Sequence, residues 1–158
     1  MLKRFTELFS RFSVHVAPDD QEHALRLATT ALMLEVARAD LDIGDKELAT
    51  VADLLCEDFE LSRAESDALL IEATKCVESA VSSYPFTRRL IDNLSIEQRG
   101  LVIERLWQVA LADDRLDKFE EATIRKLADL LYVPHSAFIR AKHAAQAPRS
   151  AAGTADDN

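Results

Sequence analysis

The sequence has little of the two residues that most often interrupt helices. Its 158 residues include only 3 glycines and 4 prolines, so turn signals are few and the stretches between them are long. Apolar residues make up 48% of the chain, which is more than disordered proteins contain. A chain of this length buries a core of its own and is typical of one domain. These features favour an all-α, single-domain protein.

Cysteine and long apolar runs are also scarce. The two cysteines, Cys56 and Cys76, lie inside apolar helical patterns and form neither a CxxC pair nor any other metal-ligand spacing. We find no secretory signal, so we expect reduced core thiols and a cytoplasmic protein. No apolar run approaches the roughly 18 residues that are needed to span a bilayer.

The motifs of common catalytic sites are absent. The sequence has no glycine-rich phosphate loop, and neither cysteine has a histidine near it in the chain. The Glu-x-x-His pairs of four-helix di-iron sites do not occur. The nearest spacing, Asp20 with His23, is a single copy beside a helix start. We therefore expect a protein that is not an enzyme.

Positive charge is in deficit. The chain has 19 Lys and Arg residues against 28 Asp and Glu residues, a formal net charge of −9. A surface of this charge repels phosphate backbones, so we expect no nucleic-acid partner. The same repulsion applies to oxyanions, whereas the negative charge of the surface favours a cation as ligand.

The chain does contain an internal repeat. Residues 36–47 read VARADLDIGDKE and residues 109–120 read VALADDRLDKFE, and the two align without a gap at an offset of 73. In each copy an apolar helix runs into an acidic turn, and a second amphipathic helix follows. Repeats of this kind are supersecondary units that share one core. We predict a bundle of about seven to eight helices over residues 18–146, made of two helical-hairpin halves related by a pseudo-twofold axis.

Apolar periodicity and capping signals place the individual helices. A helix from Asp19 to about Ala39 is apolar over so much of its circumference that it should be central to the first half. Further helices are expected at residues 45–58, from a capping box at residue 62 to about residue 82 with Val81 inward, and around residues 90–91. The last three are expected from a second capping box at residue 95, through residues 124–131, and from residue 134 onward. Trp107 is expected to be a core or groove anchor.

The two ends of the chain differ from this bundle. Residues 2–12, within the N-terminal segment 1–17, form a basic amphipathic stretch whose apolar face carries Phe5, Phe9 and Phe12. This pattern suits docking on the bundle, binding of a partner protein, or peripheral contact with an anionic membrane. Residues 147–158 have no apolar side chain larger than alanine, and we expect them to form a disordered tail.

The two acidic turns are the constellation that points to a ligand. Hard cations prefer carboxylate and carbonyl oxygens, and a helix C-terminus presents unpaired carbonyls. We therefore expect a divalent cation such as Ca²⁺, Mg²⁺ or Mn²⁺. Pseudo-twofold packing either brings the two turns together or holds them apart. The candidate ligands are Asp40, Asp42, Asp45 and Glu47 in the first turn, and Asp113, Asp114, Asp117 and Glu120 in the second.

A purely structural alternative for these turns stays open. Asp117 and Glu120 have the spacing of a capping box, and Gly44 with Glu47 holds the same two positions in the first copy. Asp40 and Asp113 can each accept a backbone N–H bond within their own turns. The EF-hand template does not fit, because neither copy has glycine at its sixth position or glutamate at its twelfth.

The repeated Ala-x-Ala-Asp…Glu turns resemble those of the tellurite-resistance TerB family, whose helical domains repeat an Ala-Asp-Gly-x-Ile-Asp-x-x-Glu-like motif. The resemblance covers roughly residues 22–143, including residues 84–88 and 133–135, although Leu41 and Asp114 replace the motif glycine. It implies an all-helical, non-enzymatic module linked to tellurite or metal stress, with protein partners and a divalent cation at the acidic turns. The alternative is a pure interaction scaffold that its N-terminus recruits to a membrane or a partner.

Overall fold

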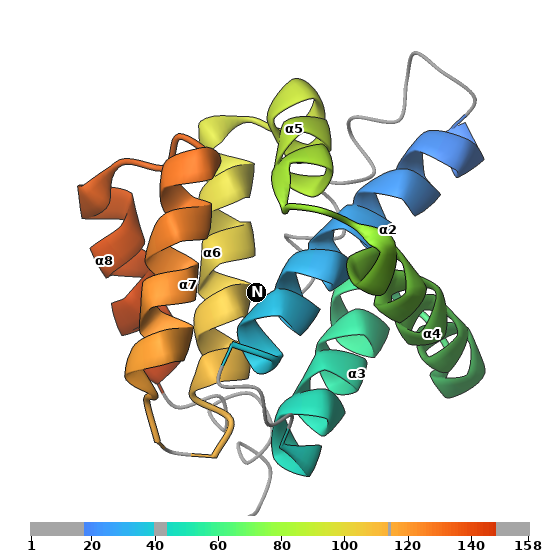
Figure 1. Ribbon diagram of the computed structural model, residues 1–158, viewed down its shortest axis with the longest axis horizontal. Helices are drawn as coiled ribbons and strands as arrows, with labels where there is room; N and C mark the ends of the chain where they lie inside the picture. Colours follow the sequence, from blue (N-terminus) through green and yellow to red (C-terminus); the bar gives the residue numbers. More distant parts are fainter. Residues whose placement is uncertain (1–17, 40–43, 114, 148–158) are drawn as a thin grey trace, which may run out of the picture.

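The computed structural model describes residues 18–39, 44–113 and 115–147, and helices dominate all of them except the short connections. The helices are α2 (Pro18–Ala37), α3 (Asp45–Phe59), α4 (Arg63–Ser79), α5 (Tyr84–Asn93), α6 (Ile96–Ala110), α7 (Lys118–Leu130) and α8 (His135–Gln146) (Figure 1). These ranges contain no strand, so the all-α prediction is confirmed. None of the described helices is long and apolar enough to cross a membrane. The predicted N-terminal segment, and the tail beyond residue 147, lie outside the described residues.

Both predicted capping boxes are present. At the start of α4 the Ser62 hydroxyl accepts the Glu65 N–H at 3.2 Å, and the Glu65 carboxylate accepts the Ser62 N–H at 3.1 Å. At the start of α6 the same pair of bonds joins Ser95 and Gln98, at 3.2 and 2.7 Å. Each box satisfies two of the N–H groups that a helix start leaves without a partner. These local signals fix where both helices begin.

The connection between α4 and α5 corrects one prediction. Helix α4 ends at Ser79 rather than near residue 82, and Ala80 takes extended backbone angles (φ −81°, ψ 139°). Val81 was expected to point inward, and this was wrong, because the extended residue turns it out into full exposure. Helix α5 then begins at Tyr84, with Pro85 in its first turn. Proline is tolerated there because a helix start needs no N–H donor at that place.

Helix α2 crosses the middle of the molecule. In Figure 1, α6, α7 and α8 lie on one side of it, α3 and α4 on the other, and α5 at the top. Helices α2 and α6 pack on each other. Helix α2 also contacts α7, and helix α6 also contacts α3. Trp107 is completely buried, which confirms it as a core residue. The two cysteines carry free thiols but are only half-buried.

The segments α2–α4 and α6–α8 repeat the same order of elements. In both, the second helix ends with a residue in the left-handed region, Glu60 (φ 54°) after α3 and Tyr132 (φ 55°) after α7. The next residue then bonds back to a carbonyl five residues earlier, Leu61 to Cys56 at 3.2 Å and Val133 to Ala128 at 2.9 Å. This is the Schellman motif, and it usually uses glycine. The pseudo-twofold relation between the two segments stays a prediction.

These two left-handed residues are sites where glycine should stabilise the fold. The left-handed conformation costs an ordinary residue about 1–2 kcal/mol in the folded state. The greater freedom of glycine in the unfolded chain reduces the gain in stability from the substitution by about 0.5–1 kcal/mol. We expect Tyr132→Gly to raise the free energy of unfolding by about 0.5–1 kcal/mol. Tyr132 is 70% exposed, so little packing is lost. Urea denaturation measures the gain, and Tyr132→Ala, which keeps the strain, should show none of it.

Candidate functional site

The two acidic turns lie at the same end of the molecule. In Figure 1 the start of α3 and the turn between α6 and α7 are both at the lower end of the bundle. A cavity of about 350 Å³ is lined by residues 44–47 from the first turn and by Asp113 and Arg115 from the second. Of the two arrangements that the sequence leaves open, the packing brings the turns together.

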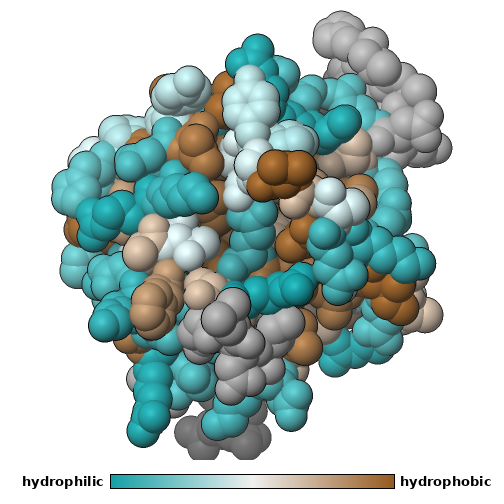
Figure 2. Space-filling view, in the orientation of Figure 1, coloured by the Kyte–Doolittle hydropathy of each residue, from teal (hydrophilic) through white to brown (hydrophobic). Residues whose placement is uncertain are grey.

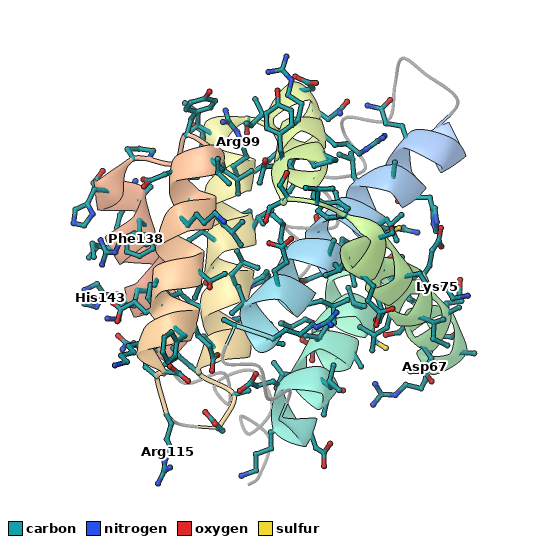
Figure 3. The ribbon with its side chains drawn as sticks, viewed as in Figure 1. Asp67, Lys75, Arg99, Arg115, Phe138 and His143 are labelled. Carbon is teal, nitrogen blue, oxygen red and sulfur yellow. The ribbon has the colours of Figure 1, made fainter. Side chains whose placement is uncertain are left out.

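A second cavity adjoins the first. It measures about 310 Å³ and is lined by Asp113, Arg115, Leu116, Asp117 and Glu120. Asp113 and Arg115 therefore line both cavities. Figure 3 shows the Arg115 side chain pointing away from the body of the protein, so its positive charge lies at the rim. Sequence reasoning passed over Arg115, although its place two residues after Asp113 was a signal that it belongs to this end.

Glu47 and Glu120 have nearly buried side chains at equivalent positions. They are 3% and 1% exposed, and each lies three residues after the residue that precedes its helix, Gly44 for α3 and Asp117 for α7. The N–H groups and the dipole of a helix start favour negative charge at this place. A carboxylate removed from water needs compensation, and its oxygens are also ligands that hard cations prefer.

The two described aspartates of the second turn, Asp113 and Asp117, form hydrogen bonds within the turn itself. Oδ1 of Asp113 accepts the N–H of Arg115 at 3.1 Å, and Oδ1 of Asp117 accepts the N–H of Phe119 at 2.8 Å. Asp117 is therefore the N-cap of α7, as its spacing predicted. Gly44 holds the same place before α3 without a side-chain acceptor. Each capping carboxylate has a second oxygen, so a cap can also serve as a ligand.

The remaining predicted ligands divide into two groups. Asp45 is exposed in the first turn of α3, whereas Asp40, Asp42 and Asp114 lie outside the described residues. Within residues 18–39, 44–113 and 115–147, no three His, Cys, Asp or Glu side chains are grouped so that they could hold a metal ion. The described carboxylates thus bring oxygen donors of suitable chemistry to one end of the bundle, without a converged ligand set.

A buried ion pair outside the turns was missed by sequence reasoning. Nε of Arg105 on α6 donates to Oδ2 of Asp58 on α3 at 2.6 Å, and the two side chains are 6% and 0% exposed. The partners are 47 positions apart in the sequence, so no local pattern joins them. Their place between two core helices identifies a structural tie and not a binding site.

The comparisons with known proteins give one match. A family model described as tellurite resistance protein TerB matches residues 26–143, which include both acidic turns and well over half of the chain. No curated protein and no solved structure matches the chain. The matched range agrees with the residues that carry the resemblance in the sequence.

Proposed function

The chain belongs to the TerB family, and from that premise we propose that it is a non-enzymatic module of the tellurite and metal-stress response. It binds a divalent cation, Ca²⁺, Mg²⁺ or Mn²⁺, at its paired acidic turns, and it docks partner proteins. TerB domains are in general helical and non-catalytic, which supports the absence of a reaction in this proposal.

The observation that carries the cation proposal is the shared end of the two turns. Residues 44–47 and Asp113 line one cavity. The nearly buried Glu47 and Glu120 hold equivalent places in the two turns, Glu47 in this cavity and Glu120 in the adjoining one. Oxygen donors without nitrogen or sulfur favour a hard cation over zinc or copper. The proposed ligands are Asp45, Glu47, Asp113, Asp117 and Glu120, together with Asp40, Asp42 and Asp114 outside the described residues.

The same features argue against an oxyanion as the ligand at this end. The protein carries a formal net charge of −9, and most of the coloured surface at the lower end of Figure 2, where the turns lie, is hydrophilic. Three carboxylates line each cavity, against Lys46 and Arg115 in the first and Arg115 alone in the second, so an oxyanion in either would meet an excess of negative charge. Repulsion between like charges makes such binding unfavourable.

The second turn should be the stronger cation site. It has Asp117 at the place where the first turn has Gly44, so its N-cap position carries a carboxylate that the first turn lacks. We expect Ca²⁺, Mg²⁺ or Mn²⁺ to raise the melting temperature of the wild type. At a hundredfold excess of the ion over its dissociation constant, the free energy of unfolding should rise by about 2.7 kcal/mol. Asp113→Asn combined with Asp117→Asn should abolish this gain, because amides are weaker ligands than carboxylates. Calorimetric melting with and without each ion measures it.

The metal-free form of the double variant is the control. Asparagine is as good an N-cap as aspartate. Without metal, the free energy of unfolding of the variant should therefore lie within about 1 kcal/mol of the wild-type value. A wild type that shows no shift with any divalent ion at millimolar concentration would rule out the cation site.

That outcome would favour the second candidate function, an interaction scaffold whose acidic turns are only caps. The hydrogen bonds of Asp113 and Asp117 to their own turn support this reading. Either candidate docks partners, and Phe119 supports docking at this end. Phe119 is 55% exposed and lies two residues after the cap residue Asp117, and exposed aromatic side chains are common anchors of interfaces.

A further inference from the structure

Helix α5 is fastened to α2 at both of its ends by side-chain hydrogen bonds. Before its first residue, the Ser83 hydroxyl donates to Oε2 of Glu35. At its last residue, Oδ1 of Asn93 accepts from Nε2 of Gln21. The pairing of residue 83 with 35 and of 93 with 21 shows that α5 runs antiparallel to α2. Helix α5 is therefore a short strap along α2, tied near both ends of that helix, and it lies at the top of the molecule in Figure 1.

The apolar attachment of this strap is narrow. Helix α5 has 10 residues, of which only Phe86, Thr87 and Leu90 are buried. Its main packing partner is α2, with a smaller contact to α7. A short helix with few buried side chains belongs to the part of a fold that opens most easily. The two polar ties therefore add to a small apolar contact in holding α5 in place.

One of these ties is ionisable. Glu35 is half-buried on α2, where α5 supplies the Ser83 hydroxyl and α7 supplies Lys126 as the charged group that acts on it. Burial raises the pKa of the Glu35 carboxyl above its ordinary value, and the hydrogen bond from Ser83 and the charge of Lys126 oppose this rise. Ser83 precedes α5 but makes no side-chain cap for it, and its backbone is helical (φ −75°, ψ −8°) where an N-cap is usually extended.

We propose that Glu35, Ser83 and Lys126 form a proton-controlled clamp that sets how readily α5 opens away from α2. A neutral Glu35 lies half-buried without a charge to desolvate. An ionised Glu35 keeps its charge partly out of water for as long as α5 is closed, and opening of α5 returns the carboxylate to solvent.

The direction of the effect follows from proton linkage. Opening of α5 reduces the burial that raises the pKa of Glu35, so the carboxyl holds its proton more tightly in the closed state than in the open state. The extra stability of the closed state is complete below the pKa of the open state, and it is lost as the pH rises through the higher pKa of the closed state. Helix α5 therefore opens more readily at neutral pH than in mild acid.

Hydrogen exchange of the α5 amides in the full-length chain tests the clamp, measured from pH 4 to pH 8 and corrected for the intrinsic pH dependence of exchange. In the wild type we expect the opening constant of α5 to rise with pH. Glu35→Gln keeps an acceptor for Ser83 but cannot ionise, so this pH dependence should be lost and α5 should be better protected at neutral pH. Ser83→Ala removes a bond that lowers the pKa, so its profile should move to higher pH.

The matched control is Glu72→Gln on α4, which removes an exposed carboxylate paired with His23 at 3.0 Å and should leave the α5 profile unchanged. Two results would overturn the proposal. One is a Glu35→Gln variant that keeps the pH dependence of the wild type. The other is an α5 that exchanges only together with the core helix α6, at every pH. The Ser83→Ala profile decides the question if Glu35→Gln does not fold.

Discussion

Replacing Asp58 by asparagine should lower the free energy of unfolding by about 3–5 kcal/mol. The Asp58 side chain is 0% exposed and accepts a bond of 2.6 Å from Arg105, which is 6% exposed. The amide keeps the shape of the carboxylate but removes the counter-charge that lies closest to the buried guanidinium, and the Glu104 carboxylate, at 4.0 Å from Nη1 of Arg105, is too distant to replace that hydrogen bond. Gln108, which accepts from Arg105 at 3.3 Å, is neutral and cannot replace the counter-charge. Urea denaturation of wild type and variant measures the loss.

An exposed ion pair on the same helix provides the control for Asp58. Asp53 accepts a bond of 3.2 Å from Arg63, and the two side chains are 55% and 60% exposed. Asp53→Asn should change stability by less than about 1 kcal/mol, because water already screens this pair. If Asp58→Asn and Asp53→Asn both lowered the free energy of unfolding by less than about 1 kcal/mol, the Asp58 pair would not be desolvated in solution. Asp58→Leu combined with Arg105→Met should recover much of the loss, because it removes both buried charges.

The features that sequence reasoning predicted correctly depend on neighbours in the chain. The capping boxes at Ser62 and Ser95 need only residues three positions apart, and both are present. The N-cap role of Asp117 was predicted in the same way. Val81 shows the limit of such reasoning, since its apolar period fits a helix that had already ended at Ser79. One extended residue, Ala80, reverses the direction of the side chain that follows it.

The features that could not be predicted depend on residues far apart. The offset between the two acidic turns showed that they are related, but only the packing of the two segments decides that they share a cavity. Capping-box spacing gave no sign that Glu47 and Glu120 would be nearly buried. Glu35 and Ser83 are separated by 48 positions, and an amphipathic pattern does not state which helix will face a polar residue.

Replacing Phe138 by alanine should lower the free energy of unfolding by about 3–5 kcal/mol. Phe138 is 2% exposed, and its ring centre lies 5.2 Å from that of Trp107 on α6. It and Ala141 are the buried residues of α8, and Ala137, Ile139 and Ala145 are only partly buried, so the variant removes the largest buried side chain that attaches this helix. Helix α8 should then detach first, exposing Trp107, the single tryptophan of the chain. The emission of Trp107 should move to longer wavelength at denaturant concentrations where α6 is still folded.

Phe119 gives a control of the same chemistry. Its ring is 55% exposed on α7, so Phe119→Ala removes the same atoms from a surface position and should change stability by less than about 0.5 kcal/mol. The Trp107 emission of the Phe119→Ala variant should follow that of the wild type at every denaturant concentration. If Phe138→Ala instead unfolds in one step, with emission and helix content changing together, α8 is not a separately detachable helix. The contact between Phe138 and Trp107 then belongs to the same cooperative core as α2 and α6.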